Sequence, residues 1–578
     1  MKHMANPDEI KLSPVKRLFR LLRVEKEDIF NIYMYSILYS LINFSLPLGI
    51  QSIINLITSG QVTTSWIILI LLVLAGIAIG GVFQLKQLTV SEALQQKIFT
   101  RAAFEFAYRI PNMRQETLEN KHSPELVNRF FDSITIQKGL SKILMDFSGA
   151  LLMVVLGLLV ISFYHPFFIF FSLFVVIYLS VIFFITTKQG LKTSLKESKF
   201  KYEVAYWLEE VARTHDVFRY SGKNELHLEK TDELLTGYIG ARKAHFKVLR
   251  GKYINMIIFK ILVAAGLLAL GGWLVIDQKM NIGQFVASEI IIILLLNSIE
   301  KVILNMEVIY DVLTGLDKLG QVTDMPLEEE AGLKLDDKNT TEGLHIVLNN
   351  AGFNYPLEKT KAISNLEFNI VAGSKLNFMG GSGSGRSTLL NILSASFPLS
   401  EGNMTINGIP VNNLDIPHLR KKIAVVRSVD QIFKGTIIEN ISLGSSKPNL
   451  EKISGLCERL GLSNFIFQSK DGFNTELLPG GKGIPYSAAY KILIARALYI
   501  EPKLFLVDEG FDSLSHKDQE IVADEIFSGM HQFTFLSFSN RRALAEKCSN
   551  TVFLEKGKIT QVLTYKQAEE KNLFNSFI

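Results

Sequence analysis

The chain has 578 residues, of which 48% are apolar and 20% charged, and its mean hydropathy is +0.23. This composition excludes a single soluble domain, a disordered chain, a collagen-like chain and a disulfide scaffold, and it predicts that part of the chain lies in a membrane. A net charge of +5 over this length gives no reason to expect nucleic acid as a partner.

The N-terminal 26 residues are basic but hold no early apolar core followed by a small-residue cleavage site. We therefore expect no removable signal peptide and a cytoplasmic N-terminus. Apolar runs long enough to cross about 30 Å of hydrocarbon follow. They lie near residues 29–58, 66–86, 144–164, 166–187, 253–276 and 282–305. Because six spans are an even number, they return the chain to the cytoplasm.

The connections between these runs predict their orientation. The short connections at 58–65, 164–166 and 277–281 carry few charges, whereas the long, helix-compatible ones at 86–142 and 188–252 are rich in Lys and Arg. The positive-inside rule places such basic segments in the cytoplasm. We expect a multi-pass protein of the cell membrane, in bacteria the inner membrane, with both termini in the cytoplasm and lipid as a neighbour.

Ionisable residues inside the predicted spans are few, because a charge is costly there, and Glu289 and Lys260 are two of them. Glu289 either caps or pairs locally near the outer end of its helix, or lines a translocation path. Lys260 lies two turns into the fifth span, and its long side chain is expected to extend to the cytoplasmic interface.

After the last span the pattern changes to alternating strands and helices. An acidic, loop-like stretch near residues 324–337 separates the two halves. We therefore expect a transmembrane domain at 1–320, a linker at 321–342 and an α/β domain at 343–578. Cys457 and Cys548 have no metal-ligand or disulfide spacing and are expected to be buried or idle thiols.

A glycine-rich loop lies near the start of the α/β domain. It follows a predicted strand at Lys375–Met379 and precedes a helix predicted from Leu389. Its residues are Gly380, Gly381, Ser382, Gly383, Ser384, Gly385, Arg386, Ser387 and Thr388. This is the spacing of a phosphate-binding P-loop, with Arg386 in place of the usual lysine and Ser387 as a ligand for Mg²⁺.

A second motif lies about 120 residues later, where an apolar strand at Leu504–Val507 ends in Asp508 and Glu509. In phosphoryl-transfer sites such an aspartate holds Mg²⁺ and such a glutamate polarises the attacking water. The order of strand, glycine-rich loop, helix and acid-tipped strand therefore predicts a P-loop nucleotide-binding fold with ATP and Mg²⁺ as cofactors.

Six spans followed by this domain resemble the half-transporters of the ATP-binding cassette (ABC) exporter family. Residues 353–356 resemble the family's adenine-stacking loop, with Tyr355 as the ring, and residues 433–441 and 494–498 match two further motifs. Residues 47–51 and 282–287 are similar to the type I secretion and toxin-exporter branch. The resemblance implies a dimer with a second half-transporter, identical or different. It also implies coupling helices near residues 113–120 and 211–218 that transmit closure of the nucleotide domains.

The chain departs from the family at several motif positions. Ser428 stands at the glutamine position, Asn540 at the switch histidine and Ser515 at the D-loop aspartate. The signature sequence LSGGQ falls on residues 484–488, which read Ile, Pro, Tyr, Ser and Ala. In family dimers each ATP lies between one chain's P-loop and the partner's signature, so this chain weakens both sites that it contributes to.

The resemblance implies an exporter subunit that moves an unknown substrate, either a peptide or protein or a hydrophobic molecule, out across the membrane. ATP binding is expected, whereas hydrolysis is expected to be weak or to depend on the partner. The alternative is a membrane scaffold or regulatory subunit without hydrolysis, which uses its nucleotide domain to dimerise or to sense nucleotide.

Overall fold

The computed structural model describes residues 12–60, 64–118, 123–220, 222, 224–336, 343–355, 358 and 360–576, without the side chains of residues 123–124, 182–188, 509 and 575–576. The chain forms two compact units. Unit 1 comprises Met1–Met113 and Leu118–Pro326, and unit 2 comprises Arg114–Thr117 and Leu327–Ile578.

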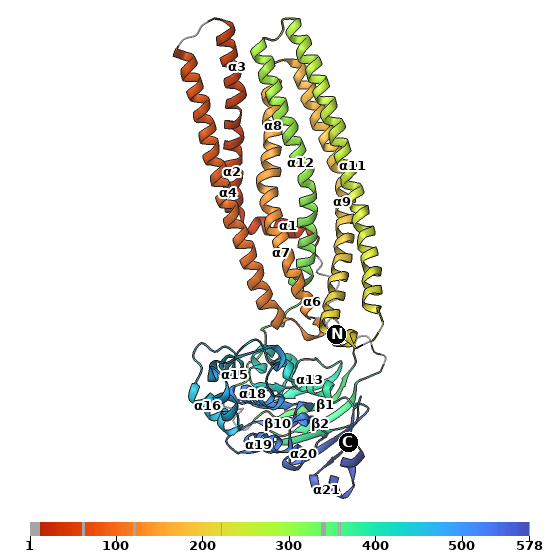
Figure 1. The fold of residues 1–578 in the computed structure, drawn as a ribbon. Coiled ribbons are helices and arrows are strands. Elements are labelled where there is room, and N and C mark those ends of the chain that lie inside the picture. Colours follow the sequence, from red (N-terminus) through yellow and green to blue (C-terminus); the bar gives the residue numbers. More distant parts are fainter. Residues whose placement is uncertain are drawn as a thin grey trace. The chain divides into compact units, whose positions relative to one another are not determined.

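Unit 1 consists of helices, several of them more than 40 residues long (Figure 1). In chain order they are α1 (Pro14–Val24), α2 (Lys26–Asn43), α3 (Ser45–Thr58), α4 (Thr64–Asn112), α6 (Ser123–Asn128), α7 (Asp132–Lys142), a π-helical turn η2 (Ile143–Phe147), α8 (Ser148–Ser162), α9 (Pro166–Arg213), α10 (His215–Arg219), α11 (Leu226–Ile276) and α12 (Ile282–Thr323). The predicted multi-pass helical architecture is thereby confirmed.

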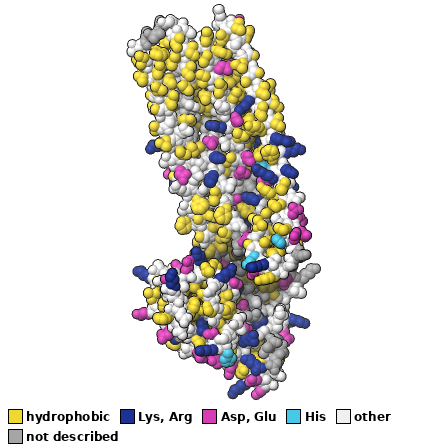
Figure 2. Space-filling view, in the orientation of Figure 1, with side chains coloured by type: hydrophobic (Ala, Val, Ile, Leu, Met, Phe, Trp, Pro, Cys, Tyr) yellow, Lys and Arg dark blue, Asp and Glu magenta, His cyan; other side chains and the backbone are white. Residues whose placement is uncertain are grey.

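Within the described residues, five stretches of helix are long and apolar enough to cross a membrane: Lys26–Thr58, Thr64–Asn112, Glu125–Ser162, Leu226–Ile276 and Ile282–Thr323. A shorter apolar helix, Pro166–Val181, covers most of the remaining predicted span. The end of that predicted span, residues 182–187, lies where the structure does not describe the side chains. Figure 2 shows hydrophobic side chains gathered on the outer surface of the apolar parts of these helices, as contact with lipid requires.

The long basic connections between spans continue the membrane helices for many turns. α4 runs on to Asn112, α9 to Arg213, and α11 begins at Leu226. Within these extensions, the Trp207 indole nitrogen of α9 donates to the Thr231 hydroxyl of α11 over 3.1 Å. Side-chain contacts of this kind hold α9 beside α11 in parts too polar for a bilayer.

Lys260 has a partner that the sequence did not predict. Its ammonium group forms an ion pair with the Glu300 carboxylate of α12. Both side chains are about 28% exposed. Since a charge is costly in the membrane interior, an opposite charge on the neighbouring helix is favoured over an unpaired one. Glu289 is half-buried on α12 beside Gly271 of α11.

Unit 2 contains two main sheets. Strands β12, β11, β3, β10, β9 and β6 form one sheet in that order, parallel except for the β11–β12 pair. Strands β2, β1, β4 and β5 form an antiparallel sheet. The strands are β1 (Ile346–Phe353), β2 (Ile363–Ile370), β3 (Lys375–Met379), β4 (Glu401–Ile406), β5 (Ile409–Pro410), β6 (Ile423–Val426), β7 (Gly435–Thr436), β8 (Glu476–Leu477), β9 (Leu504–Val507), β10 (Thr534–Ser537), β11 (Asn550–Glu555) and β12 (Lys558–Leu563).

Helices pack around the parallel sheet of unit 2 and supply much of its core. They are α13 (Arg386–Leu393), α14 (Ile416–Arg420), α15 (Ile437–Ser442), α16 (Leu450–Arg459), α17 (Ser463–Gln468), α18 (Tyr486–Tyr499), α19 (His516–Phe527), α20 (Arg542–Lys547) and α21 (Tyr565–Glu570). β3 and β9 occupy the two strands predicted from sequence. The predicted α/β P-loop fold is thus confirmed.

The parallel strands determine where the functional residues meet. In a parallel sheet, the loops that follow the carboxyl ends of the strands lie along one edge. Here β3 leads into the glycine-rich loop, β6 into Arg427, β9 into Asp508 and β10 into Phe538 and Asn540. Segments up to 160 residues apart in the chain therefore meet at that edge, where Asn540 bonds Gly380.

Candidate functional site

The glycine-rich loop forms an open cradle between β3 and α13. Gly383 and Gly385 have φ values of +74° and +99°, which residues with a Cβ rarely adopt. Gly381, Ser382, Gly383 and Ser387 are exposed. The helix begins at Arg386, three residues before the predicted start at Leu389, because the left-handed Gly385 ends the loop there.

Ser384 supports the assignment of this cradle to phosphate. Its side chain is 5% exposed, and its hydroxyl has no hydrogen-bond partner within the described residues. A Cβ added at Gly380 would lie 2.6 Å from that hydroxyl and 2.5 Å from the Leu554 carbonyl oxygen. A buried unsatisfied donor beside exposed backbone and a helix N-terminus fits the phosphate of a nucleotide.

Arg386, at the lysine position of the motif, extends to the end of β10. It is 8% exposed, and its guanidinium donates to the Asn540 side-chain oxygen over 3.1 Å and to the Phe538 carbonyl over 3.5 Å. Asn540 also accepts from the Gly380 backbone N–H at 3.2 Å and donates to the Gly380 carbonyl at 3.1 Å. The residue at the switch position is therefore bonded to the start of the loop.

Asp508, the predicted metal-binding carboxylate, has an arginine beside it. Its backbone N–H donates to the Val426 carbonyl over 2.9 Å, and Arg427 is the next residue. Burial lowers the pKa of Arg427, whereas the negative charge of Asp508 opposes that shift. The Arg427 guanidinium donates to the Asn391 side chain of α13. Glu509 is the residue predicted to polarise water, and the structure does not describe its side chain.

Tyr355, the predicted adenine-stacking ring, packs against the same part of the unit. Its hydroxyl lies 3.0 Å from the Thr388 hydroxyl, so Thr388 bonds to this ring. The ring also meets Phe353 edge-on, with centroids 5.1 Å apart. Pro356, the last residue of the predicted motif, lies outside the described residues. The structure thus brings Tyr355 to the helix that follows the cradle.

The signature position forms contacts within its own chain. Tyr486 begins α18, and its hydroxyl donates to the Gly510 carbonyl over 2.8 Å. Its ring stacks on Tyr490 with centroids 6.1 Å apart. Burial raises the pKa of Tyr490 well above its usual range. The tyrosine that replaces a glycine thus contacts the loop that follows Asp508 and Glu509.

Replacing Tyr486 with Phe is expected to destabilise this contact by about 1 kcal/mol, because the Gly510 carbonyl loses a hydrogen bond while the stacked ring remains. Hydrogen exchange should show faster exchange in residues 510–513, with little change elsewhere in unit 2. Tyr565→Phe, in α21, provides the control for removing a hydroxyl. Equal exchange in the Tyr486→Phe and natural chains would contradict the proposed contact.

Sequence reasoning missed Arg427 and did not predict the contacts of Arg496, which lies in the motif at 494–498. Arg427 directly follows a strand and precedes Ser428. This position was the available signal that its side chain could reach the site. Arg496 of α18 donates to the Asn440 carbonyl over 2.6 Å, to its side-chain oxygen over 2.8 Å and to the Gln431 carbonyl over 2.9 Å. Burial lowers the pKa of Arg496 to about 10. The hydrogen bonds of Arg496 to Asn440 connect the motif at 494–498 with the motif at 433–441.

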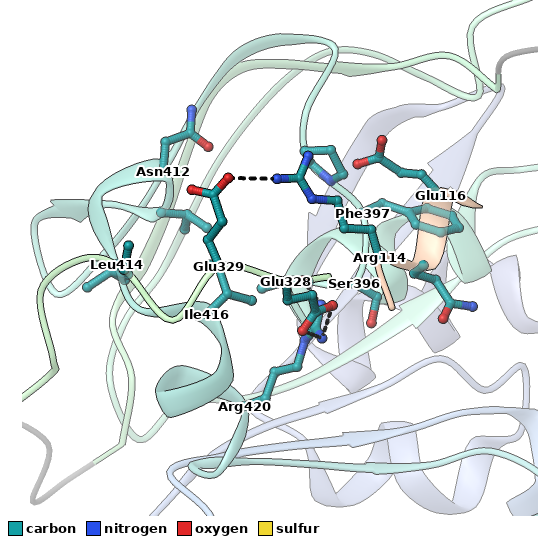
Figure 3. Close-up of a pocket in the computed structure, with 15 residues that line it drawn as sticks. Arg114, Glu116, Glu328, Glu329, Ser396, Phe397, Asn412, Leu414, Ile416 and Arg420 are labelled. Atoms are coloured by element: carbon teal, nitrogen blue, oxygen red, sulfur yellow. Dashed lines mark hydrogen bonds and ion pairs between the residues drawn. The ribbon is translucent and has the colours of Figure 1, made fainter. Parts of the chain in front are cut away.

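Unit 2 contains a pocket of 320 Å³ that is lined by Phe397 (Figure 3). The Phe397 ring also stacks on Phe353 and meets Tyr355 edge-on. Arg114 pairs with Glu329 over 3.1 Å at its rim. Arg114 directly precedes α5 (Gln115–Leu118), a short helix within the predicted first coupling segment, whose residues 119–120 lie outside the description. α10 (His215–Arg219) overlaps the second.

Comparison with known proteins gives matches over both units. Residues 29–299 match the ABC transporter transmembrane region, and residues 363–512 match the ABC transporter domain. The solved structure of a bacterial Atm1-family ABC exporter with ATP bound aligns with a TM-score of 0.81 over 96% of this chain and 98% of the other. At 16% identity this alignment shows the fold alone.

Three curated relatives have similar sequences. The alpha-hemolysin translocation ATP-binding protein HlyB of Escherichia coli is 26% identical over 60% of this chain and 48% of its own length. The transport/processing ATP-binding protein ComA of Streptococcus pneumoniae is 25% identical over 92% and 74%. The ABC-type transmembrane transporter verA of Clonostachys rogersoniana is 28% identical over 40% and 19%. The match thus spans half or less of HlyB and verA, and about three quarters of ComA.

Proposed function

Because the chain is an ABC exporter half-transporter, with the transmembrane region and the ABC domain of that family, we propose that it is one subunit of a dimeric exporter of a polar, peptide-like substrate. Closure of the nucleotide domains on ATP changes the side from which the spans are open. Its relatives HlyB and ComA are named as translocation and transport/processing proteins, which supports a peptide or protein substrate.

The substrate class is inferred from a cavity of 560 Å³ inside unit 1. It lies between α2, α4, α8 and α12, at the part of each helix that lies in or next to a predicted span. Eleven of the seventeen residues that line it are polar or charged: Ser36, Tyr39, Ser40, Asn43, Gln84, Gln87, Asp146, Asn297, Ser298, Glu300 and Lys301. Such a lining is costly in a bilayer unless it serves a polar ligand or water, which favours a peptide over a hydrophobic molecule.

The wall of this cavity is held in place by hydrogen bonds between helices. The Gln87 amide donates to the Ser36 hydroxyl over 2.6 Å, and these side chains are 5% and 1% exposed. Glu300 is fixed by its ion pair with Lys260. A rigid wall of hydrogen-bonding groups can bind peptide amides at little cost in side-chain entropy.

ATP is the proposed nucleotide. The support is the open glycine cradle, the buried Ser384 hydroxyl and the Tyr355 ring near α13. We propose that ATP is held by residues 380–388 and that hydrolysis, if the partner supplies what this chain lacks, uses Asp508 and Glu509.

A second candidate function, a regulatory subunit without hydrolysis, is favoured by the contacts of the replaced residues. Tyr486 bonds Gly510 and Asn540 bonds Gly380, so both positions form contacts within the chain. Such contacts suit a nucleotide domain that binds and holds ATP. Turnover measurements, described in the Discussion, separate the two functions.

We propose a bacterial inner membrane as the location, with both termini in the cytoplasm, on the basis of the basic connections and the relatives from bacteria. The proposed partner is a second half-transporter. Gentle purification from the native membrane, followed by mass spectrometry, should recover either the same chain alone or one homologue at equal amount. Recovery of a stable monomer would contradict the dimer.

Replacing Asn297 with Leu is expected to lower transport of labelled peptides into inside-out vesicles by about tenfold, since an amide that bonds the substrate is replaced by an apolar group. ATP binding should be unchanged. Asn305→Leu is the matched control, because Asn305 is on the same helix but does not line the cavity. Unchanged peptide transport by Asn297→Leu, or transport of hydrophobic dyes only, would contradict a polar substrate.

A further inference from the structure

Arg427 lies beside Asp508, the carboxylate at which the P-loop motif predicts a metal ion. Val426 of β6 pairs with Val507 of β9 in parallel register, so the next residues, Arg427 and Asp508, leave the sheet side by side. The Asp508 backbone N–H bonds the Val426 carbonyl over 2.9 Å, which continues this register. The positive charge of Arg427 therefore lies beside the carboxylate expected to hold Mg²⁺.

The Arg427 side chain also reaches the helix that carries the other expected metal ligand. Its guanidinium donates to Asn391 of α13. Asn391 follows Ser387 by four residues, and residues four apart lie on the same face of a helix. The guanidinium thus extends from the end of β6 to the helix face of Ser387, with Asp508 on the neighbouring strand.

The residues at this edge do not fit Mg²⁺. Mg²⁺ requires octahedral oxygen ligands and usually one or two carboxylates in addition to phosphate and water. Asp508 already lies beside Arg427, whose guanidinium interacts with its negative charge. The Ser428 hydroxyl is turned away, because it donates to the Asp430 carboxylate over 2.9 Å and accepts from the Asp430 backbone N–H at 3.1 Å. Ser387, exposed at the cradle, remains as one neutral ligand.

We propose that Arg427, together with Arg386, supplies the positive charge that a divalent cation would bring, so that this chain binds ATP without Mg²⁺. The inference rests on the proposed nucleotide binding and names the residue that sets its metal requirement. Guanidinium groups suit this task, because their planar forks donate two hydrogen bonds to phosphate oxygens and keep their charge when partly buried.

This assignment gives a role to Arg386, which departs from the P-loop pattern, and to Arg427. Arg386 is fixed by Asn540, and Arg427 is fixed by Asn391 of α13. Two fixed cations lose little side-chain entropy when phosphate binds. A nucleotide held without a metal ion has no cation that bridges its β- and γ-phosphates during transfer, which agrees with weak hydrolysis.

The test compares ATP binding with and without metal. Full-length protein in lipid nanodiscs is titrated with radiolabelled ATP in excess MgCl2 and in excess EDTA. We expect the two dissociation constants of the natural chain to agree within about threefold. Arg427→Gln should weaken binding in EDTA by about tenfold or more, with a smaller change in MgCl2. Lys421→Gln, an exposed position with the same change in charge, should behave as the natural chain.

The outcomes separate this inference from the proposed function. ATP binding in MgCl2 that is lost in EDTA would overturn the inference and leave nucleotide binding intact. ATP binding in neither condition would overturn both. If Arg427→Gln weakened binding equally in both conditions, Arg427 would be only structural, and the inference would fail.

Mn²⁺ provides a readout that is independent of affinity. Electron paramagnetic resonance of the ATP-loaded natural chain should detect well below one protein-bound Mn²⁺ per nucleotide. The Arg427→Gln variant should approach one, because the position beside Asp508 becomes free for a cation. Arg427→Lys, which keeps the charge, should stay close to the natural chain. One bound Mn²⁺ per nucleotide in the natural chain would overturn the proposal.

Discussion

A chain with seven changes in its nucleotide domain is expected to hydrolyse ATP about a hundredfold faster than the natural chain. Six changes introduce the family's residue: Arg386→Lys, Ser428→Gln, Tyr486→Gly, Ser487→Gly, Ala488→Gln and Asn540→His. The seventh, Arg427→Gln, opens the position beside Asp508 to Mg²⁺. Removing a single donor that stabilises a transition state typically costs about 10²–10³ in rate, and losing a general acid or base about 10²–10⁴. An effect of a hundredfold is therefore at the low end for several replaced positions.

The structural reason lies in the contacts of two replaced residues. The Tyr486 side chain stands at the N-terminus of α18, where the family has glycine and a close backbone approach to phosphate is needed. Asn540 is bonded to Gly380 and Arg386. The side-chain amide of Asn540 does not gain or lose a proton near neutral pH, whereas a histidine side chain does. Both positions must change before turnover can rise.

The control for this prediction is Glu509→Gln in the changed chain, which should remove the gain. Because Tyr486→Gly also removes a hydrogen bond to Gly510, the variant's fold should be checked by hydrogen exchange before its rate is measured. Rapid turnover by the natural chain, lost in Glu509→Gln, would contradict the proposed impairment and favour an exporter with full hydrolysis.

The helical half could be predicted from sequence because its signal is local. A run of about 20 apolar residues must form a helix in a bilayer, since no water is present there to satisfy the backbone. The glycine-rich loop is equally local, as positive φ at Gly383 and Gly385 requires glycine. These features depend on neighbours in the chain and need no knowledge of distant residues.

Pairs of residues distant in sequence could not be predicted. Lys260 and Glu300 meet only because α11 packs against α12, and the sequence alone favoured contact of Lys260 with the membrane interface. Arg427 and Asp508 are 81 positions apart and meet through the register of β6 and β9. The polar cavity is also non-local, since four separate helices each contribute a few of its side chains.

The ion pair between Arg459, which is partly exposed, and the buried carboxylate of Glu525 provides the largest expected effect on stability. Arg459, at the end of α16, donates through Nε to both Glu525 carboxylate oxygens, over 2.9 and 2.8 Å. The same carboxylate lies 2.9 Å from Nε2 of His531. Glu525 is 4% exposed, so its charge depends on these partners and has little contact with water. The pair joins α16 to α19 and to the segment before β10.

Replacing Arg459 with Leu is expected to destabilise unit 2 by about 3 kcal/mol, because a buried carboxylate loses its charged partner. The neighbouring residue provides a matched control. Asp524 pairs with Lys547, but these side chains are 71% and 36% exposed, so Lys547→Leu should cost less than about 1 kcal/mol. The double variant Arg459→Leu with Glu525→Leu should recover part of the loss, since no buried charge is then left unpaired.

Urea unfolding of unit 2 should be followed by hydrogen exchange, because all three tryptophans, Trp66, Trp207 and Trp273, lie in unit 1 and do not report on it. The Arg459→Leu midpoint should fall clearly below that of Lys547→Leu. Equal midpoints would show that Glu525 reaches water or another cation when Arg459 is lost. Because α16 packs against α18, loss of the pair should also speed exchange at Tyr486, so the stability of this contact and the signature position are expected to change together.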